Sequence, residues 1–257
     1  MRFLFIIFFS FANLILSGCW FDKEEEVRES ITSGLSPKTL FNDAKQRIEE
    51  GAYDEATKIF NVIEASYPSS KYAIQSKLEL IYMLYKRERY DDAINNANEF
   101  LELYPNHFST PYVYFIRGVI SETKSKSILD GIYTDNAQRD IQSVKDALNY
   151  FILLLKKYPN TKYAEEVQNK LVTLRNILAR HELYVAIFYT KNDGYIAAIN
   201  RCKYIIEKFP NTPSVPAALH LIAYNYDKIN APKLAEDARK VLKVSYPKYT
   251  QHYTLED

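Results

Sequence analysis

The chain of 257 residues carries 33 basic and 32 acidic side chains, and this balance argues against a nucleic-acid binder that depends on a basic excess. Only 6 glycines are present, too few for the turns of β-barrels or for glycine-rich phosphate loops. Two cysteines, Cys19 and Cys202, exclude a disulfide framework, whereas 47% hydrophobic residues suffice for a packed core.

The first segment has the pattern of a lipoprotein export signal. Met1 and Arg2 precede an almost wholly apolar run over residues 3–16, which is short for a membrane span and suits a signal-peptide core. The sequence LSGC that ends at Cys19 resembles a bacterial lipobox, in which residues 1–18 are removed and the cysteine is lipidated. An ordinary secretory signal with an incidental cysteine is the alternative.

A tether is predicted to follow the lipidated cysteine. Trp20 stands where an aspartate is associated with retention in the inner membrane, so we expect a lipid anchor in the outer membrane, facing the periplasm. Residues 22–36 are charged and rich in turn formers, which is typical of a spacer between lipid and folded body. We therefore expect residues 19–36 to form a lipidated tether.

An aromatic residue followed by proline recurs through the rest of the chain, and each pair ends a predicted helix because proline cannot continue one. The spacings are 37, 54, 51 and 37 residues. The pairs are Tyr67-Pro68, Tyr104-Pro105, Tyr158-Pro159, Phe209-Pro210 and Tyr246-Pro247. A helix pair of 34 residues with proline at about position 32 is the tetratricopeptide repeat (TPR). The sequence thus predicts an all-α TPR solenoid of five helix-pair repeats, with enlarged third and fourth repeats.

The repeat frame also predicts which residues pack the two helices of each pair together. Small residues are expected at positions 8 and 20 of the repeat, and larger apolar ones near its end. In chain order these positions hold Ala44, Ala56, Phe60, Ile63, Ile81, Tyr90, Ala93, Phe100, Gly118, Ala147, Phe151, Leu154, Ala186, Tyr195, Ala198, Ile205, Ala223, Ala235 and Leu242.

Two repeats depart from the common length. The third fits only if 17 residues over 124–140 are an inserted surface loop, which could itself bind a partner. The fourth has 14 extra residues of helical pattern, so we expect one long first helix over 163–190. The predicted boundaries are 37–109 for repeats one and two, 110–161 for three, 162–213 for four, 214–247 for five, and 248–257 for a tail.

The first helices of stacked repeats line a concave groove. Its amino-terminal part is predicted to hold an aromatic cluster flanked by lysines, which suits an extended peptide with aromatic side chains and a terminal carboxylate near Lys45 or Lys86. The candidates are Phe41, Lys45, Tyr82, Tyr85, Tyr112 and Phe115. The alternative is that these aromatic residues pack between helices.

We find no complete catalytic motif in the sequence. His181-Glu182 begins like a zinc-protease motif, but residue 185 is Val185, so the second ligand is missing. Cys202 falls on a core position of the fourth repeat and is expected to be a small buried hydrophobe. We expect a non-enzymatic protein with no metal and no cofactor beyond the lipid on Cys19.

Several stretches together resemble the BamD family, the TPR lipoproteins of the outer-membrane β-barrel assembly machinery. They are LSPKTLFNDAKQRIEEGAYDEATKIF, SKYAIQSKLELIYMLYKRERYDDAI, FIRGV and KLVTLRNILARHELYVAIFYTKNDGYIAAINR. The last includes the lengthened fourth repeat. Arg139-Asp140 matches an Arg-Asp of the family's third repeat, but Ile141 replaces the usual proline.

The resemblance implies partners. Members dock through their carboxy-terminal repeats on the last POTRA domain of the barrel-forming subunit, alongside other assembly lipoproteins. Their amino-terminal repeats receive the carboxy-terminal β-signal of unfolded outer-membrane proteins. Tyr67 is implied at the substrate site, and Arg139, Asp140 and Arg201 at partner contacts. A periplasmic TPR lipoprotein scaffold for other cell-envelope factors is the alternative, and it need not share the long fourth-repeat helix.

Overall fold

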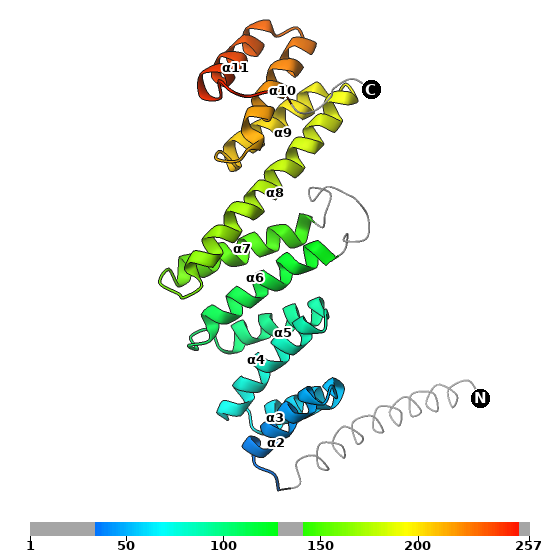
Figure 1. Ribbon diagram of the computed structural model, residues 1–257, viewed down its shortest axis with the longest axis vertical. Helices are drawn as coiled ribbons and strands as arrows, with labels where there is room; N and C mark the ends of the chain where they lie inside the picture. Colours follow the sequence, from blue (N-terminus) through cyan, green and yellow to red (C-terminus); the bar gives the residue numbers. More distant parts are fainter. Residues whose placement is uncertain (1–33, 128–140, 252–257) are drawn as a thin grey trace, which may run out of the picture. The chain divides into compact units, whose positions relative to one another are not determined.

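The computed structural model describes residues 34–127 and 141–251, and the regular structure in these ranges is entirely helical (Figure 1). The described chain divides into two compact units, one ending at Phe100 and the other beginning at Leu101. The export signal, Cys19, most of the tether, Arg139 and Asp140 lie outside the described residues.

The first unit holds α2 (Pro37–Glu49), α3 (Tyr53–Ser66), α4 (Lys71–Lys86) and most of α5 (Tyr90–Leu103). α2 begins where the sequence predicts, because Ser36 caps it by accepting a hydrogen bond from the Thr39 amide at 3.2 Å, and Pro37 occupies its first turn. α2 packs on α3, and α3 packs on α4, so consecutive helices form antiparallel neighbours as TPR pairs do.

The second unit holds α6 (Thr110–Ser127), α7 (Ile141–Lys157), α8 (Ala164–Lys191), α9 (Tyr195–Lys208), α10 (Ser214–Lys228) and α11 (Pro232–Ser245). α8 is a single helix of 28 residues, which confirms the long first helix of the fourth repeat. One expectation is wrong: the insertion predicted as a loop from residue 124 begins as helix, because α6 continues to Ser127. Nothing in 124–127 breaks a helix, since neither glycine nor proline occurs there.

The aromatic–proline pairs end helices as predicted. α3, α5, α7, α9 and α11 each stop at the residue before the aromatic member of a pair. At Tyr67, Tyr158, Phe209 and Tyr246 the aromatic amide makes the last hydrogen bond back into the helix, to the carbonyl four residues earlier, and proline removes the next donor.

The turns inside four of the helix pairs, those between α2 and α3, α4 and α5, α8 and α9, and α10 and α11, share one geometry. A residue with positive φ closes the first helix at Gly51 (79°), Glu88 (59°), Asp193 (58°) and Asn230 (56°). The amide after each of them bonds back to a carbonyl five residues earlier, as at Ala52 to Arg47 and Arg89 to Leu84. This is the Schellman ending, which satisfies carbonyls that the helix leaves without partners.

The predicted packing positions form the cores of both units. All of those named above are buried except Tyr90, Tyr195 and Leu242, which are half-buried. Gly118 shows why a small residue is needed at position 8, because a Cβ there would overlap the ring of Phe151 on α7. Phe60, Phe100 and Phe151 are fully buried. Some of the many aromatic residues in the sequence therefore pack the core and are not available for binding.

Candidate peptide-binding surface

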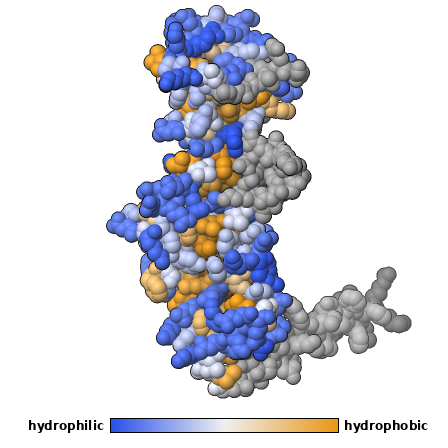
Figure 2. Space-filling view, viewed as in Figure 1, coloured by the Kyte–Doolittle hydropathy of each residue, from blue (hydrophilic) through white to orange (hydrophobic). Residues whose placement is uncertain are grey.

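Apolar side chains reach the surface between hydrophilic ones on the face drawn in Figure 2. The described chain exposes several large apolar residues, among them Tyr82 at 46% and Val172 at 59% of their surface. Single exposed apolar residues are normal in soluble proteins. A candidate site therefore needs neighbouring groups as well as exposure.

Tyr82 and Tyr85 on α4 form what we call the tyrosine face of the first unit. Their ring centroids lie 6.4 Å apart, and Tyr85 lies a further 6.4 Å from Tyr90 of α5. Neither hydroxyl of the pair makes a hydrogen bond with a described residue. The tyrosine face thus combines apolar rings with unused polar groups, which suits the contact surface of a binding protein.

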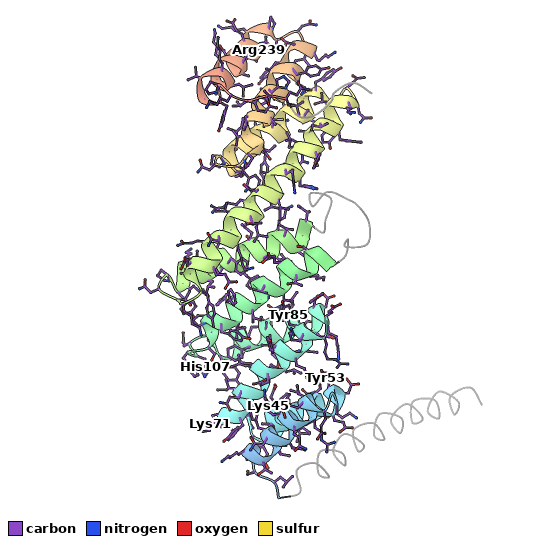
Figure 3. All side chains as sticks on the ribbon, in the orientation of Figure 1. Lys45, Tyr53, Lys71, Tyr85, His107 and Arg239 are labelled. Atoms are coloured by element: carbon purple, nitrogen blue, oxygen red, sulfur yellow. The ribbon has the colours of Figure 1, made fainter. Side chains whose placement is uncertain are left out.

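Lysines lie on both sides of Tyr82. Lys45, labelled on α2 in Figure 3, donates to Glu79 at 2.9 Å, so its charge is already paired. Lys86, four residues after Tyr82 and therefore on the same side of α4, is exposed and makes no ion pair with the described residues. Of the two lysines expected beside a peptide carboxylate, Lys86 is the one whose charge is available.

Phe41 and Tyr67 have packing contacts in the first unit. Phe41 is half-buried, with its ring centroid 5.9 Å from Phe60 and 5.6 Å from Tyr72. Tyr67 donates from its hydroxyl to the Leu35 carbonyl at 3.0 Å, which fastens the segment before α2 to the end of α3. For these two residues the geometry favours the packing interpretation.

Tyr112 and Phe115 belong to α6 in the second unit, so they and the tyrosine face are two separate sets. Phe115 stacks on Tyr163 with centroids 4.4 Å apart and an interplanar angle of 10°, and Tyr112 lies 6.3 Å from the same ring. All three are half-buried. Their contacts hold α6 against the segment that leads into α8.

Arg201, a partner-binding candidate, joins α9 to α8. Its Nη1 lies 3.1 Å from Oε2 of Glu182, whose side chain is 11% exposed. Arg201 itself is 46% exposed, so part of its guanidinium still faces solvent. The residue can both stabilise the helix pair and reach a partner.

A buried ion cluster in the first unit was not predicted from the sequence. Lys77 on α4 lies 2.9 Å from Glu64 of α3 and 2.6 Å from Glu99 of α5, with only 5% of its side chain exposed. Burial opposes its charge, but the bonds to Glu99 and Glu64 outweigh burial and raise the pKa of Lys77. A signal was available: Lys77 lies on the face of α4 defined by Ala73 and Leu80, both buried.

The thiol of Cys202 and the residue types that bind metals form no candidate site in the described ranges. Cys202 is fully buried, and burial raises the pKa of its thiol to about 12. Within residues 34–127 and 141–251, no three His, Cys, Asp or Glu side chains lie close enough together to hold a metal ion. The helices described in those ranges include none long and apolar enough to cross a membrane.

Comparison with known proteins decides the family. The model of the YfiO family, described as outer membrane lipoprotein, matches residues 34–242. The chain belongs to the YfiO family. An "Outer membrane protein assembly factor BamD" from Neisseria gonorrhoeae is 32% identical over 92% of this chain and 89% of its own length. Proteins of the same name from Xylella fastidiosa and Pasteurella multocida are each 28% identical, over 91% and 95% of this chain.

Solved structures with similar folds match this chain only weakly. The structure titled "MamA 41-end from Desulfovibrio magneticus RS-1" covers 83% of this chain and 97% of its own, with 13% identity and a TM-score of 0.36. The fold assignment therefore rests on the helix pairing and core positions described above. Membership in a family whose curated relatives are named assembly factors, together with this TPR-type fold, identifies a binding protein and not an enzyme.

Proposed function

We propose that this YfiO-family protein is an outer-membrane lipoprotein that takes part in the assembly of outer-membrane β-barrel proteins. Lipidated Cys19 anchors it at the periplasmic face of the outer membrane. It binds the barrel-forming subunit through that subunit's POTRA domain, alongside other assembly lipoproteins, and receives unfolded barrel proteins by their carboxy-terminal β-signals. Similarity to BamD proteins over about nine-tenths of the chain carries the assignment.

The tyrosine face supports the substrate part of the proposal. A β-signal is an extended segment that ends in an aromatic residue and a carboxylate. Tyr82 and Tyr85 offer aromatic contacts and hydroxyls that make no hydrogen bond with the described residues, and Lys86 offers a positive charge on the same helix that makes no ion pair with them. Such a surface can hold and release a peptide without changing it chemically.

The partner part is tested by purification. The full chain with a carboxy-terminal tag is extracted from membranes in mild detergent, and the stoichiometric partner is identified by mass spectrometry. A large β-barrel protein with POTRA domains is the expected partner. Recovery of peptidoglycan enzymes or division proteins without a barrel protein would instead support the scaffold alternative. Arg201→Leu is expected to reduce the yield of the barrel partner.

The substrate part is tested by peptide binding. The probe is a fluorescent synthetic peptide of alternating polar and aromatic residues that ends in phenylalanine with a free carboxylate. Tyr82→Ala is expected to weaken its binding by about tenfold, as loss of an aromatic anchor does. Tyr204→Ala is the matched control, because Tyr204 is similarly exposed (41%) but lies on α9. Equal binding by the two variants would remove the tyrosine face from the proposal.

A further inference from the structure

A cleft in the second unit combines an apolar wall with an unpaired positive charge. It has a volume of about 370 Å³ and lies between the middle of α8 and the end of α9 with the connection to α10. The two segments can be followed side by side in Figure 1. This volume lies in the lower part of the range of natural ligand clefts, about 300–1,000 Å³.

The charge balance of the cleft favours an anion. Arg175 of α8 is exposed at the cleft and makes no hydrogen bond or ion pair with the described residues. Lys208, at the end of α9, is neutralised by the neighbouring Glu207, whose Oε1 lies 2.8 Å from its Nζ. Arg175 therefore gives the cleft lining its net positive charge, in a group whose planar N–H donors match a carboxylate.

The other walls offer apolar surface and amide groups. Val172, one turn before Arg175 on α8, is 59% exposed, and Phe209 closes the opposite side with 8% exposed. The side-chain amides of Asn176 and Asn211 also line the cleft and make no hydrogen bond with the described residues. An asparagine amide both donates and accepts, so it can pair with a peptide backbone.

We propose that this cleft binds an extended peptide segment of a protein partner, in which an acidic side chain stands next to an apolar one. The carboxylate pairs with Arg175, the apolar side chain covers Val172 and Phe209, and the backbone bonds to Asn176 and Asn211. A free inorganic anion would bond to Arg175 and the asparagine amides but leave the apolar wall uncovered. The site is additional to the tyrosine face, which belongs to the other compact unit.

The test uses the full mature chain in detergent micelles and saturation-transfer NMR, which detects weak ligands. The probes are the peptide acetyl-Gly-Leu-Glu-Phe-Gly-amide and its counterpart with Gln in place of Glu. The Glu peptide is expected to bind wild type, and Arg175→Gln to weaken it by about tenfold, the effect of losing a charge-assisted hydrogen bond. Val172→Asp is expected to weaken it further, because it places a second negative charge beside the carboxylate.

Controls separate this cleft from other binding surfaces. Lys233→Gln removes an equal charge from exposed α11 and is expected to leave binding unchanged. Tyr82→Ala is expected to have no effect, so failure of the tyrosine face leaves this result intact. The proposal is overturned if the Gln peptide binds as well as the Glu peptide, if Arg175→Gln binds like wild type, or if Lys233→Gln or Tyr82→Ala reduces binding equally.

Discussion

Single residues of this protein show that a fixed backbone conformation in the repeat accepts different side chains at different cost. The left-handed position that ends the first helix of a pair is filled by glycine at Gly51 but by other residues at Glu88, Asp193 and Asn230. Asparagine and aspartate tolerate this conformation, whereas glutamate has no short side chain to bond locally. The positive φ of Glu88 therefore strains its backbone, and a glycine at the same position, as at Gly51, would avoid that strain.

Glu88→Gly is expected to stabilise the protein by about 0.5–1 kcal/mol. Glycine relieves the positive φ, and its greater freedom in the unfolded chain offsets only part of the gain. The midpoint of urea unfolding measures the change. Asn230→Gly is the matched control, with a smaller expected shift because asparagine already tolerates the conformation. A lower midpoint for Glu88→Gly would contradict the strain.

Cys202 is expected to be inert in the folded protein. Burial raises the pKa of its thiol to about 12, so at pH 8 the reactive thiolate is scarce as well as inaccessible. Iodoacetamide at pH 8 should leave Cys202 unlabelled until urea is added, as read by peptide mass spectrometry. Labelling in native buffer at the rate of the unfolded chain would show that α9 does not bury this position.

At the scale of helices, packing between elements decides which substitutions are tolerated. α6 can approach α7 closely because Gly118 leaves room for Phe151, a fully buried ring. α3, α4 and α5 are joined in a different way, by the charges around Lys77. The contact between Gly118 and Phe151 is steric, so it is sensitive to added volume. The contacts of Lys77 are electrostatic, so they are sensitive to loss of charge.

Gly118→Ala is expected to destabilise the second unit by about 1–3 kcal/mol, since the added methyl overlaps Phe151 and overpacking outweighs the gain in helix propensity. Urea unfolding of Gly118→Ala, Phe151→Leu and the double variant measures the coupling. The double variant should lose less stability than the sum of the two single changes, because leucine frees the space of the ring. Simple additivity would mean that the two residues do not press on each other.

Lys77→Met is expected to cost about 2–4 kcal/mol, because it leaves the carboxylate of Glu64 partly buried without its partner. Adding Glu64→Gln should restore part of the loss. Because folding raises the pKa of Lys77, its contribution is complete below the ordinary value of 10.5 and is lost as pH rises through the higher folded pKa. On the alkaline side, the stability difference between wild type and Lys77→Met should therefore shrink only above pH 10.5, and in acid it should shrink as the carboxylates of Glu64 and Glu99 are protonated. A difference that vanished at neutral pH would contradict the ion cluster.

At the scale of the whole molecule, the described helices give no means of crossing a membrane. The proposed outer-membrane location rests on the lipid expected at Cys19. One acyl chain holds a protein only marginally, and the several chains of a bacterial lipoprotein make anchoring effectively permanent.

Cys19→Ser is expected to move the protein from the membrane fraction to the soluble fraction after a high-salt wash. Fractionation followed by immunoblotting against a carboxy-terminal tag measures the shift. Cys202→Ser provides the control: it alters the other cysteine and should leave the protein in membranes. Retention of Cys19→Ser in washed membranes would show that protein contacts alone are sufficient.

Periodic patterns in the sequence predicted the helices, most of their ends and their core positions, although α6 continues further than predicted. Proline after an aromatic residue stops a helix locally, and small residues at fixed repeat positions pack each pair, so both features can be read without tertiary information. The single helix α8 was predictable for the same reason, because apolar residues recur along it without a break.

Tertiary structure decided which side chains are exposed and which charges are unpaired. Phe41 and Tyr82 are both predicted groove residues. Phe41 packs against Phe60 and Tyr72, whereas Tyr82 is nearly half exposed, and helical spacing cannot distinguish the two. Whether a charge is available depends on a residue far away in sequence, as Glu79 is for Lys45. The cleft at Arg175 likewise unites residues from α8 and from the end of α9, more than thirty positions apart. Local sequence determines conformation, whereas exposure and pairing depend on neighbours that only the folded chain supplies.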